Sequence, residues 1–212
     1  MVHVEPVSAY PPPSSRTLEQ WLDPGLGTTH QPELRTRLRE IADARAALAA
    51  MWAAFLSLGV SAILFAGVLL AVTGRAASTV PWIAVGVVLA AVSALFLSRV
   101  RRWVPRPRTS LSVRGPGNLR GGLWAAGGIL FLLNVFLVIG ALTTGRVLVM
   151  VLVDLGMVLL LTSAFVVPSA ILGRSRLTLR RQTQKDPRLA ATLERERLSW
   201  RPDGRTAMFG PL

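Results

Sequence analysis

The chain has 212 residues, of which 51% are hydrophobic, and it carries a formal net charge of +13. A single soluble domain rarely combines such hydrophobicity with such charge, whereas apolar membrane spans alternating with basic loops do so routinely. The absence of cysteine excludes disulfides, thiolate metal sites and cysteine nucleophiles, and the positions of the two histidines, His3 and His30, exclude a histidine-based site inside a span.

Residues 1–30 form a polar, proline-rich segment that contains the run Tyr10-Pro-Pro-Pro. We expect a mostly disordered tail, with one or two amphipathic helical turns at residues 17–22. It is unlike a signal peptide because no short apolar core follows a basic start, so we expect the first long apolar run to act as an uncleaved signal-anchor. In residues 31–46, Leu34, Leu38 and Ile41 recur at a helical period. This predicts a juxtamembrane amphipathic helix that begins near Pro32 and continues into the first span.

Four apolar runs follow, at residues 47–72, 79–98, 122–143 and 147–172. Each is near the ~20 residues that an α-helix needs to cross ~30 Å of hydrocarbon. Each run has at most one ionisable group in its interior, which argues against a buried-core soluble bundle. We therefore predict an all-α membrane protein, with a transmembrane domain at 47–173 made of two antiparallel helical hairpins. Pro168 is expected to kink the last helix.

The basic residues are distributed unevenly between the predicted loops. Of the 24 lysines and arginines, 22 lie before residue 47, in the loop 99–121 or after residue 173, while Arg75 and Arg146 stand alone in the two short connections. The positive-inside rule then places both termini and the 99–121 loop in the cytoplasm. The arginine-rich, alanine-rich composition is typical of a bacterial genome, so we expect a bacterial plasma-membrane protein.

The juxtamembrane arginines are also expected to attract anionic lipid headgroups. A nucleic-acid partner is the less favoured interpretation of the same charge. The arginines concerned are Arg99, Arg101, Arg102, Arg106, Arg108, Arg174, Arg176, Arg180 and Arg181.

The segment 174–212 is expected to be a mostly disordered basic tail. Within it, Asp186 and Pro187 have the residue types of a helix N-cap and first helical position, which predicts one short helix. A possible internal repeat pairs Trp52-Ala-Ala and Thr73-Gly-Arg with Trp124-Ala-Ala and Thr144-Gly-Arg. Such a repeat predicts two structurally parallel halves; coincidence is the alternative.

Small residues recur at helical spacing in the first three runs. Helices in lipid associate through close packing of such residues, either within one chain or with a partner protein or a second copy. The candidate packing positions are Ala50, Ala54, Ser57 and Ser61 in the first run, Gly86, Ala90 and Ala94 in the second, and Gly127 in the third.

Asp154 is the only ionisable residue deep within a run, and Asn134 is expected at a similar depth across the connection at Thr144-Gly-Arg. A carboxylate in lipid is costly unless it is paired, hydrated or protonated. We expect a protonated Asp154 to donate a hydrogen bond to Asn134. The pair is either a structural contact that sets helix register or a proton or cation site.

No catalytic, metal-binding or cofactor-binding motif is visible, so no enzyme activity and no cofactor are expected. The leading interpretation is a non-enzymatic accessory or scaffold subunit that works through helix packing and its cytoplasmic tails. The alternative is a small oligomeric transporter or pore that uses Asp154 and Asn134. A third interpretation, a phage-type membrane-permeabilising protein, is supported only by small size.

Overall fold

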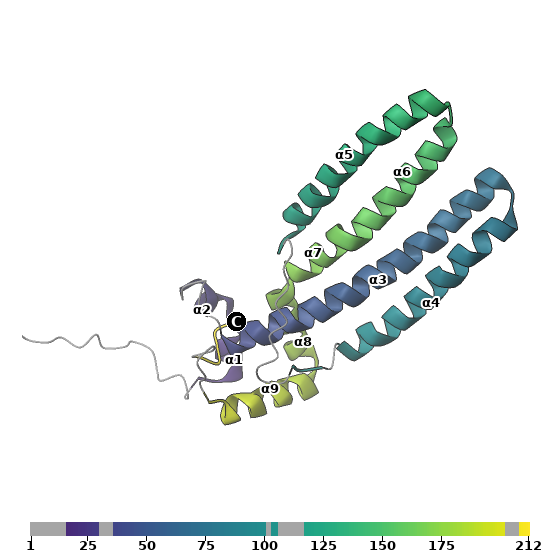
Figure 1. The fold of residues 1–212 in the computed structure, drawn as a ribbon. Coiled ribbons are helices and arrows are strands. Elements are labelled where there is room, and N and C mark those ends of the chain that lie inside the picture. The colour runs from purple at the N-terminus through teal and green to yellow at the C-terminus, as the bar shows by residue number, and fades with distance from the viewer. Residues whose placement is uncertain (1–15, 30–35, 101–102, 106–116, 202–207) are drawn as a thin grey trace, which may run out of the picture. The chain divides into compact units, whose positions relative to one another are not determined.

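A computed structural model describes residues 16–29, 36–100, 103–105, 117–201 and 208–212 (Figure 1). The described residues are helical apart from turns, short irregular segments and one isolated parallel bridge between Thr36 and Met208. The helices are α1 (Leu18–Trp21), α2 (Pro24–Thr29), α3 (Arg37–Thr73), α4 (Ala76–Val100), α5 (Leu119–Thr144), α6 (Val147–Leu161), the π-helix η2 (Thr162–Val166), α7 (Val167–Leu172), α8 (Ser175–Lys185) and α9 (Pro187–Ser199).

The chain divides into two compact units. Unit 1 consists of residues 1–43 and 176–212, and unit 2 consists of residues 44–175. The helix α3 begins in unit 1 and continues into unit 2. Unit 2 has eleven arginines and one acidic residue, so it carries +10 of the net charge.

Four helical stretches of unit 2 are long and apolar enough to cross a membrane: α3, α4, α5 and the continuous run Val147–Leu172. The predicted runs 79–98, 122–143 and 147–172 agree with these helices to within three residues, and the run 47–72 lies inside α3. Large apolar side chains point outward, for example Phe131 at 70% and Phe136 at 72% exposure. A helix that is apolar all round suits a lipid environment, so the chain has the features of a helical multi-pass membrane protein.

The helices α3 and α4 contact each other through two pairs of aromatic rings. Trp52 stacks on Phe96 with ring centroids 4.4 Å apart, and Phe65 meets Trp82 edge-on at 5.5 Å. The contacting residues thus fall in reverse order along the two helices. The buried residues of α4 are spaced seven apart, which is the repeat of a coiled-coil seam. They are Thr79, Gly86, Ser93 and Val100.

The two short connections, at residues 73–75 and 144–146, have the same local structure. Gly74 and Gly145 both adopt φ of +65°, a left-handed conformation that glycine tolerates without a Cβ penalty. In each connection the threonine hydroxyl accepts from the arginine backbone N–H, at 3.3 and 3.4 Å. It also donates to the carbonyl four residues earlier, at 2.7 Å in both. The Thr-Gly-Arg motifs of the proposed repeat therefore share one conformation.

The last apolar helix contains a π-turn directly before Pro168. The Val167 N–H donates to the Thr162 carbonyl, five residues back. Pro168 lacks an N–H and follows in the first turn of α7. A π-turn is one of the recognised causes of local helix distortion. The structure therefore has a local irregularity at residues 162–166, and the kink expected at Pro168 stays a prediction.

Unit 1 corrects the expectation of a mostly disordered C-terminal tail, because residues 175–199 form α8 and α9. Asp186 is the N-cap of α9, with Pro187 in the first turn, as predicted. In the N-terminal segment, Thr17 and Gln20 form a capping box around α1, while residues 1–15 and 31–35 lie outside the described residues. The tails have a shared apolar core, which the sequence reasoning missed. Its largest members are Trp21, Leu38, Ile41, Leu179, Leu189, Leu193, Phe209 and Leu212.

Candidate functional site

Asn134 and Asp154 meet between α5 and α6. The Asn134 side-chain amide donates to Asp154 Oδ1 at 2.9 Å and to the Leu130 carbonyl at 3.1 Å. The contact agrees with the similar depth that the sequence predicts for the two residues. The direction of the hydrogen bond is the reverse of the expected one, because the Asn134 amide is the donor and Asp154 is the acceptor. This arrangement suits a carboxyl in lipid because the amide compensates part of its lost hydration.

A second polar contact joins α3 to the π-turn. The Ser163 hydroxyl lies 3.0 Å from that of Ser57 and 3.2 Å from that of Ser61, and it donates to the Leu159 carbonyl at 2.8 Å. Ser163 is 2% exposed. Two of the predicted packing positions therefore act through their hydroxyls. Ser163 itself was missed, since one serine in an apolar run has no distinctive sequence signal.

The helices α3 and α4 also approach each other closely at Gly59 and Gly86. A Cβ on Gly86 would lie 2.6 Å from the Gly59 carbonyl oxygen, and a Cβ on Gly59 would lie 2.7 Å from the Gly86 carbonyl oxygen. Only glycine fits such backbone contact. Gly86 was predicted as a packing position, and Gly59 was not. At Gly86 the close packing is made within the chain, against α3, which is one of the two uses expected for these positions.

The other small-residue positions behave differently from one another. Ala50 is buried, Ala54 and Ala90 are half-buried, and Ala94 is exposed. Residues spaced by four drift about 40° round a helix at each step, which carries Ala94 away from the face that starts at Gly86. Gly127 is also exposed, and a Cβ added to it would meet no heavy atom within 4 Å.

The buried positions on α5 are Gly122 and Ala126 instead. A Cβ on Gly122 would lie 2.4 Å from the Ser169 hydroxyl oxygen and 2.8 Å from the Phe165 carbonyl oxygen. The small pair at i and i+4 is the sequence signal that would have identified this contact. Gly122 thus allows α5 to lie directly against the distorted end of the last apolar helix.

The described juxtamembrane arginines fall into two groups. Arg99, Arg174, Arg176 and Arg181 are exposed. Arg180 is not available as a lipid contact in the same way, because its Nε donates to the Leu22 carbonyl and joins α8 to the end of α1. The predicted lipid-contacting residues Arg101, Arg102, Arg106 and Arg108 lie outside the described residues.

The best-defined charged cluster of unit 1 surrounds Arg37, which is fully buried. Its guanidinium pairs with Glu40 at 2.9 Å and with Glu196 at 2.7 Å. It also lies over the ring of Trp200, 5.9 Å from the centroid. A buried guanidinium requires such partners, so this cluster joins the start of α3 to α9.

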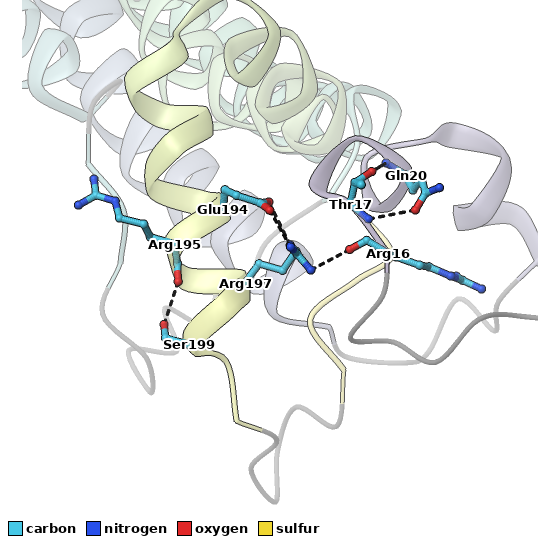
Figure 2. Close-up of polar contacts among 7 residues, drawn as sticks. All are labelled: Arg16, Thr17, Gln20, Glu194, Arg195, Arg197 and Ser199. Carbon is cyan, nitrogen blue, oxygen red and sulfur yellow. Dashed lines mark hydrogen bonds and ion pairs between the residues drawn. The ribbon is translucent and has the colours of Figure 1, made fainter.

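A further set of polar contacts joins α9 to the N-terminal segment (Figure 2). Arg197 pairs with Glu194 at 2.7 Å and donates to the Arg16 carbonyl at 2.9 Å, beside the capping box of α1. The hydrogen bond from Arg197 lowers the pKa of Glu194, and the same bond raises the pKa of Arg197.

Among the described residues, no three His, Cys, Asp or Glu side chains lie close enough together to hold a metal ion. Comparison of the chain with protein families, with curated proteins and with solved structures found no match. Any function of this protein is therefore inferred from the contacts within each of the two units.

Proposed function

We propose that this protein is a non-enzymatic accessory or scaffold subunit of a bacterial plasma membrane and works by binding a membrane-protein partner or a second copy of itself. The main support for the proposal is the folded core of unit 1. Both ends of the chain contribute to one folded core around Trp21, Leu38 and Leu193, with the buried Arg37 pairing with Glu196. A mere pair of solubilising tails does not need such a core, whereas a binding module does.

The proposed topology is two antiparallel hairpins with both termini in the cytoplasm. The reversed order of the α3–α4 contacts and the Asn134–Asp154 bond support the hairpins. The 22 basic residues in three of the five non-spanning segments support the orientation. Single cysteines at Ala77 and Arg181, both exposed, test it in this cysteine-free chain. In intact cells an impermeant maleimide should label Ala77→Cys and spare Arg181→Cys; the opposite result contradicts the orientation.

The binding role is tested by the size and composition of the detergent-extracted particle. We expect the wild-type protein to purify in a particle larger than one chain, with the same partner or copy number from two detergents. Purification as a lone monomer from both detergents contradicts the proposal. Replacing Asp154 by Asn should leave the particle unchanged, because an Asn at this position still accepts the hydrogen bond from Asn134.

A small oligomeric transporter or pore is the second candidate, favoured by the presence of a carboxyl in the spanning region. This function predicts ion or proton flux in vesicles that contain the purified protein, and loss of that flux in Asp154→Asn. We rank it second because the pair lacks another carboxylate, lysine or histidine within the spans to relay a proton. Flux that depends on Asp154 would reverse this ranking.

A further inference from the structure

The last five residues, 208–212, form a short segment without helix that we call the C-terminal strap. Its backbone carbonyls at Met208 and Phe209 accept hydrogen bonds from the N–H groups of Arg37 and Leu38, at 3.1 and 2.9 Å. These N–H groups belong to the first turn of α3, where a helix has no carbonyls of its own to satisfy them. The strap therefore caps the helix that continues into the first apolar run.

The rest of the strap is bound as closely. Thr36 Oγ1 donates to the Pro211 carbonyl at 2.7 Å, and the Leu212 N–H donates to the Trp21 carbonyl at 3.1 Å. Gly210 lies against the Trp21 indole, where a Cβ would be 2.5 Å from a ring atom. Phe209 and Leu212 are 5% and 3% exposed.

The receiving surface, residues Trp21, Thr36, Arg37 and Leu38, is here called the strap groove. It offers two helix-terminal N–H donors, one hydroxyl donor, one carbonyl acceptor and a flat indole. This set recognises an extended apolar peptide with a glycine over the indole. In this structure residues 208–212 of the same chain occupy the strap groove.

We propose that the strap exchanges between copies, so that the strap of one copy occupies the strap groove of a second. All four hydrogen bonds named above are made to residues 21–38, and a second copy presents the same residues. The strap also meets Trp200, the residue that follows α9, through the ring of Phe209, with ring centroids 6.3 Å apart. Exchange conserves the groove contacts, which makes it a low-cost route to a dimer.

Confinement in a bilayer brings the strap of one copy close to the strap groove of another. Copies inserted in the same orientation carry unit 1 on the same side of the membrane, which raises the effective concentration of each strap for a neighbouring groove. The inference rests on the proposed function, since it names a second copy as the partner and the strap as the means of binding it.

A disulfide between two differently tagged copies tests the exchange. One copy carries Thr36→Cys and the other carries Met208→Cys, the two residues of the parallel bridge. The chain has no other cysteine, so a mixed disulfide reports a strap in the groove of another copy. The matched control replaces Met208→Cys with Leu198→Cys, an exposed position on α9. We expect at least about tenfold more mixed dimer from the bridge pair than from the control pair.

A free peptide of residues 208–212 should suppress the mixed disulfide, and the same peptide with Gly210→Ala should not, because its methyl group meets the Trp21 ring. A single chain with both cysteines controls for folding and should form the disulfide internally. If the single chain forms its internal disulfide but the two tagged copies form no mixed dimer, the exchange is overturned. If neither experiment gives a disulfide, the placement of the strap itself is overturned. If mixed dimers are absent while the extracted particle still exceeds one chain, the proposed function stands and the strap exchange fails.

Discussion

Replacing Gly86 by alanine should push α3 and α4 apart locally and destabilise the fold. The matched replacement of Gly127 by alanine should have neither effect. A Cβ on Gly86 would lie 2.6 Å from the Gly59 carbonyl oxygen and 2.7 Å from Ile63 Cγ1, whereas one on Gly127 has nothing within 4 Å. Ordinary contact begins near 3.4 Å, so the helices must move apart locally by about 0.8 Å. A gap of that size removes about a quarter to a half of the dispersion energy of each affected atom pair.

The expected cost follows from two opposing terms. Overpacking of this kind costs about 1–3 kcal/mol. Exchange of glycine for alanine returns about 0.4–1 kcal/mol by restricting the unfolded chain, and only this second term applies at Gly127. Gly86→Ala should therefore be less stable than wild type by about 1.3 kcal/mol, the difference of the two midpoints, and by about 2.6 kcal/mol at most, while Gly127→Ala should be at least as stable as wild type.

The measurement is equilibrium unfolding of the purified protein in mixed micelles, followed by tryptophan fluorescence, to which Trp52 contributes from its stack on Phe96 across the α3–α4 contact. Both variants add one methyl group to a glycine in an apolar helix, so effects on insertion should cancel between them. Equal stability of the two variants would show that the Gly59–Gly86 approach does not contribute to the fold, and it would refute this reasoning.

Three further predictions concern single polar groups. Asn134→Leu should destabilise the α5–α6 contact by about 0.6–2 kcal/mol in the same unfolding assay. Asp154→Asn should cost less, because an Asn at position 154 still accepts the hydrogen bond from Asn134. Equal effects of the two changes would show that this 2.9 Å hydrogen bond is unimportant. Ser163→Ala should cost about 1 kcal/mol for each hydrogen bond removed, and a neutral result contradicts a role for the hydroxyl cluster. The pKa of Glu194 is lowered by the hydrogen bond from Arg197, so its contribution to stability is present above the ordinary carboxyl pKa and is lost as pH falls through the folded-state pKa. Glu194→Gln should therefore flatten the loss of unit 1 stability between about pH 6 and pH 3, measured by Trp fluorescence, and an unchanged acid limb would assign the loss to other carboxyls.

The helical membrane character of the chain follows from the sequence alone, and the structure confirms the limits of the last three apolar helices to within three residues. Hydropathy is a local property, and a run such as 147–172 reports it without knowledge of its neighbours. The capping of α9 by Asp186 was predictable for the same reason, because the N-cap and the first turn are adjacent in sequence. The similar depth of Asn134 and Asp154 needed only the short connection between their helices and the rise per residue.

Three features depended on tertiary structure. Gly59 and Ser163 become important only through Gly86 and Ser57, and which helix faces meet is decided by packing between segments distant in sequence. The same holds for unit 1, whose segments 16–29 and 175–199 each look too polar to bury a core. Their few apolar residues are enough once Trp21, Leu38 and Leu193 share one interior. The local sequence pattern determined which segments of this protein are helices suited to lipid. Long-range packing decided which glycines touch and which polar groups pair, and it decided that the two tails fold together. The physical reason is that burial in these contacts depends on both partners, and a single sequence segment contains only one of them.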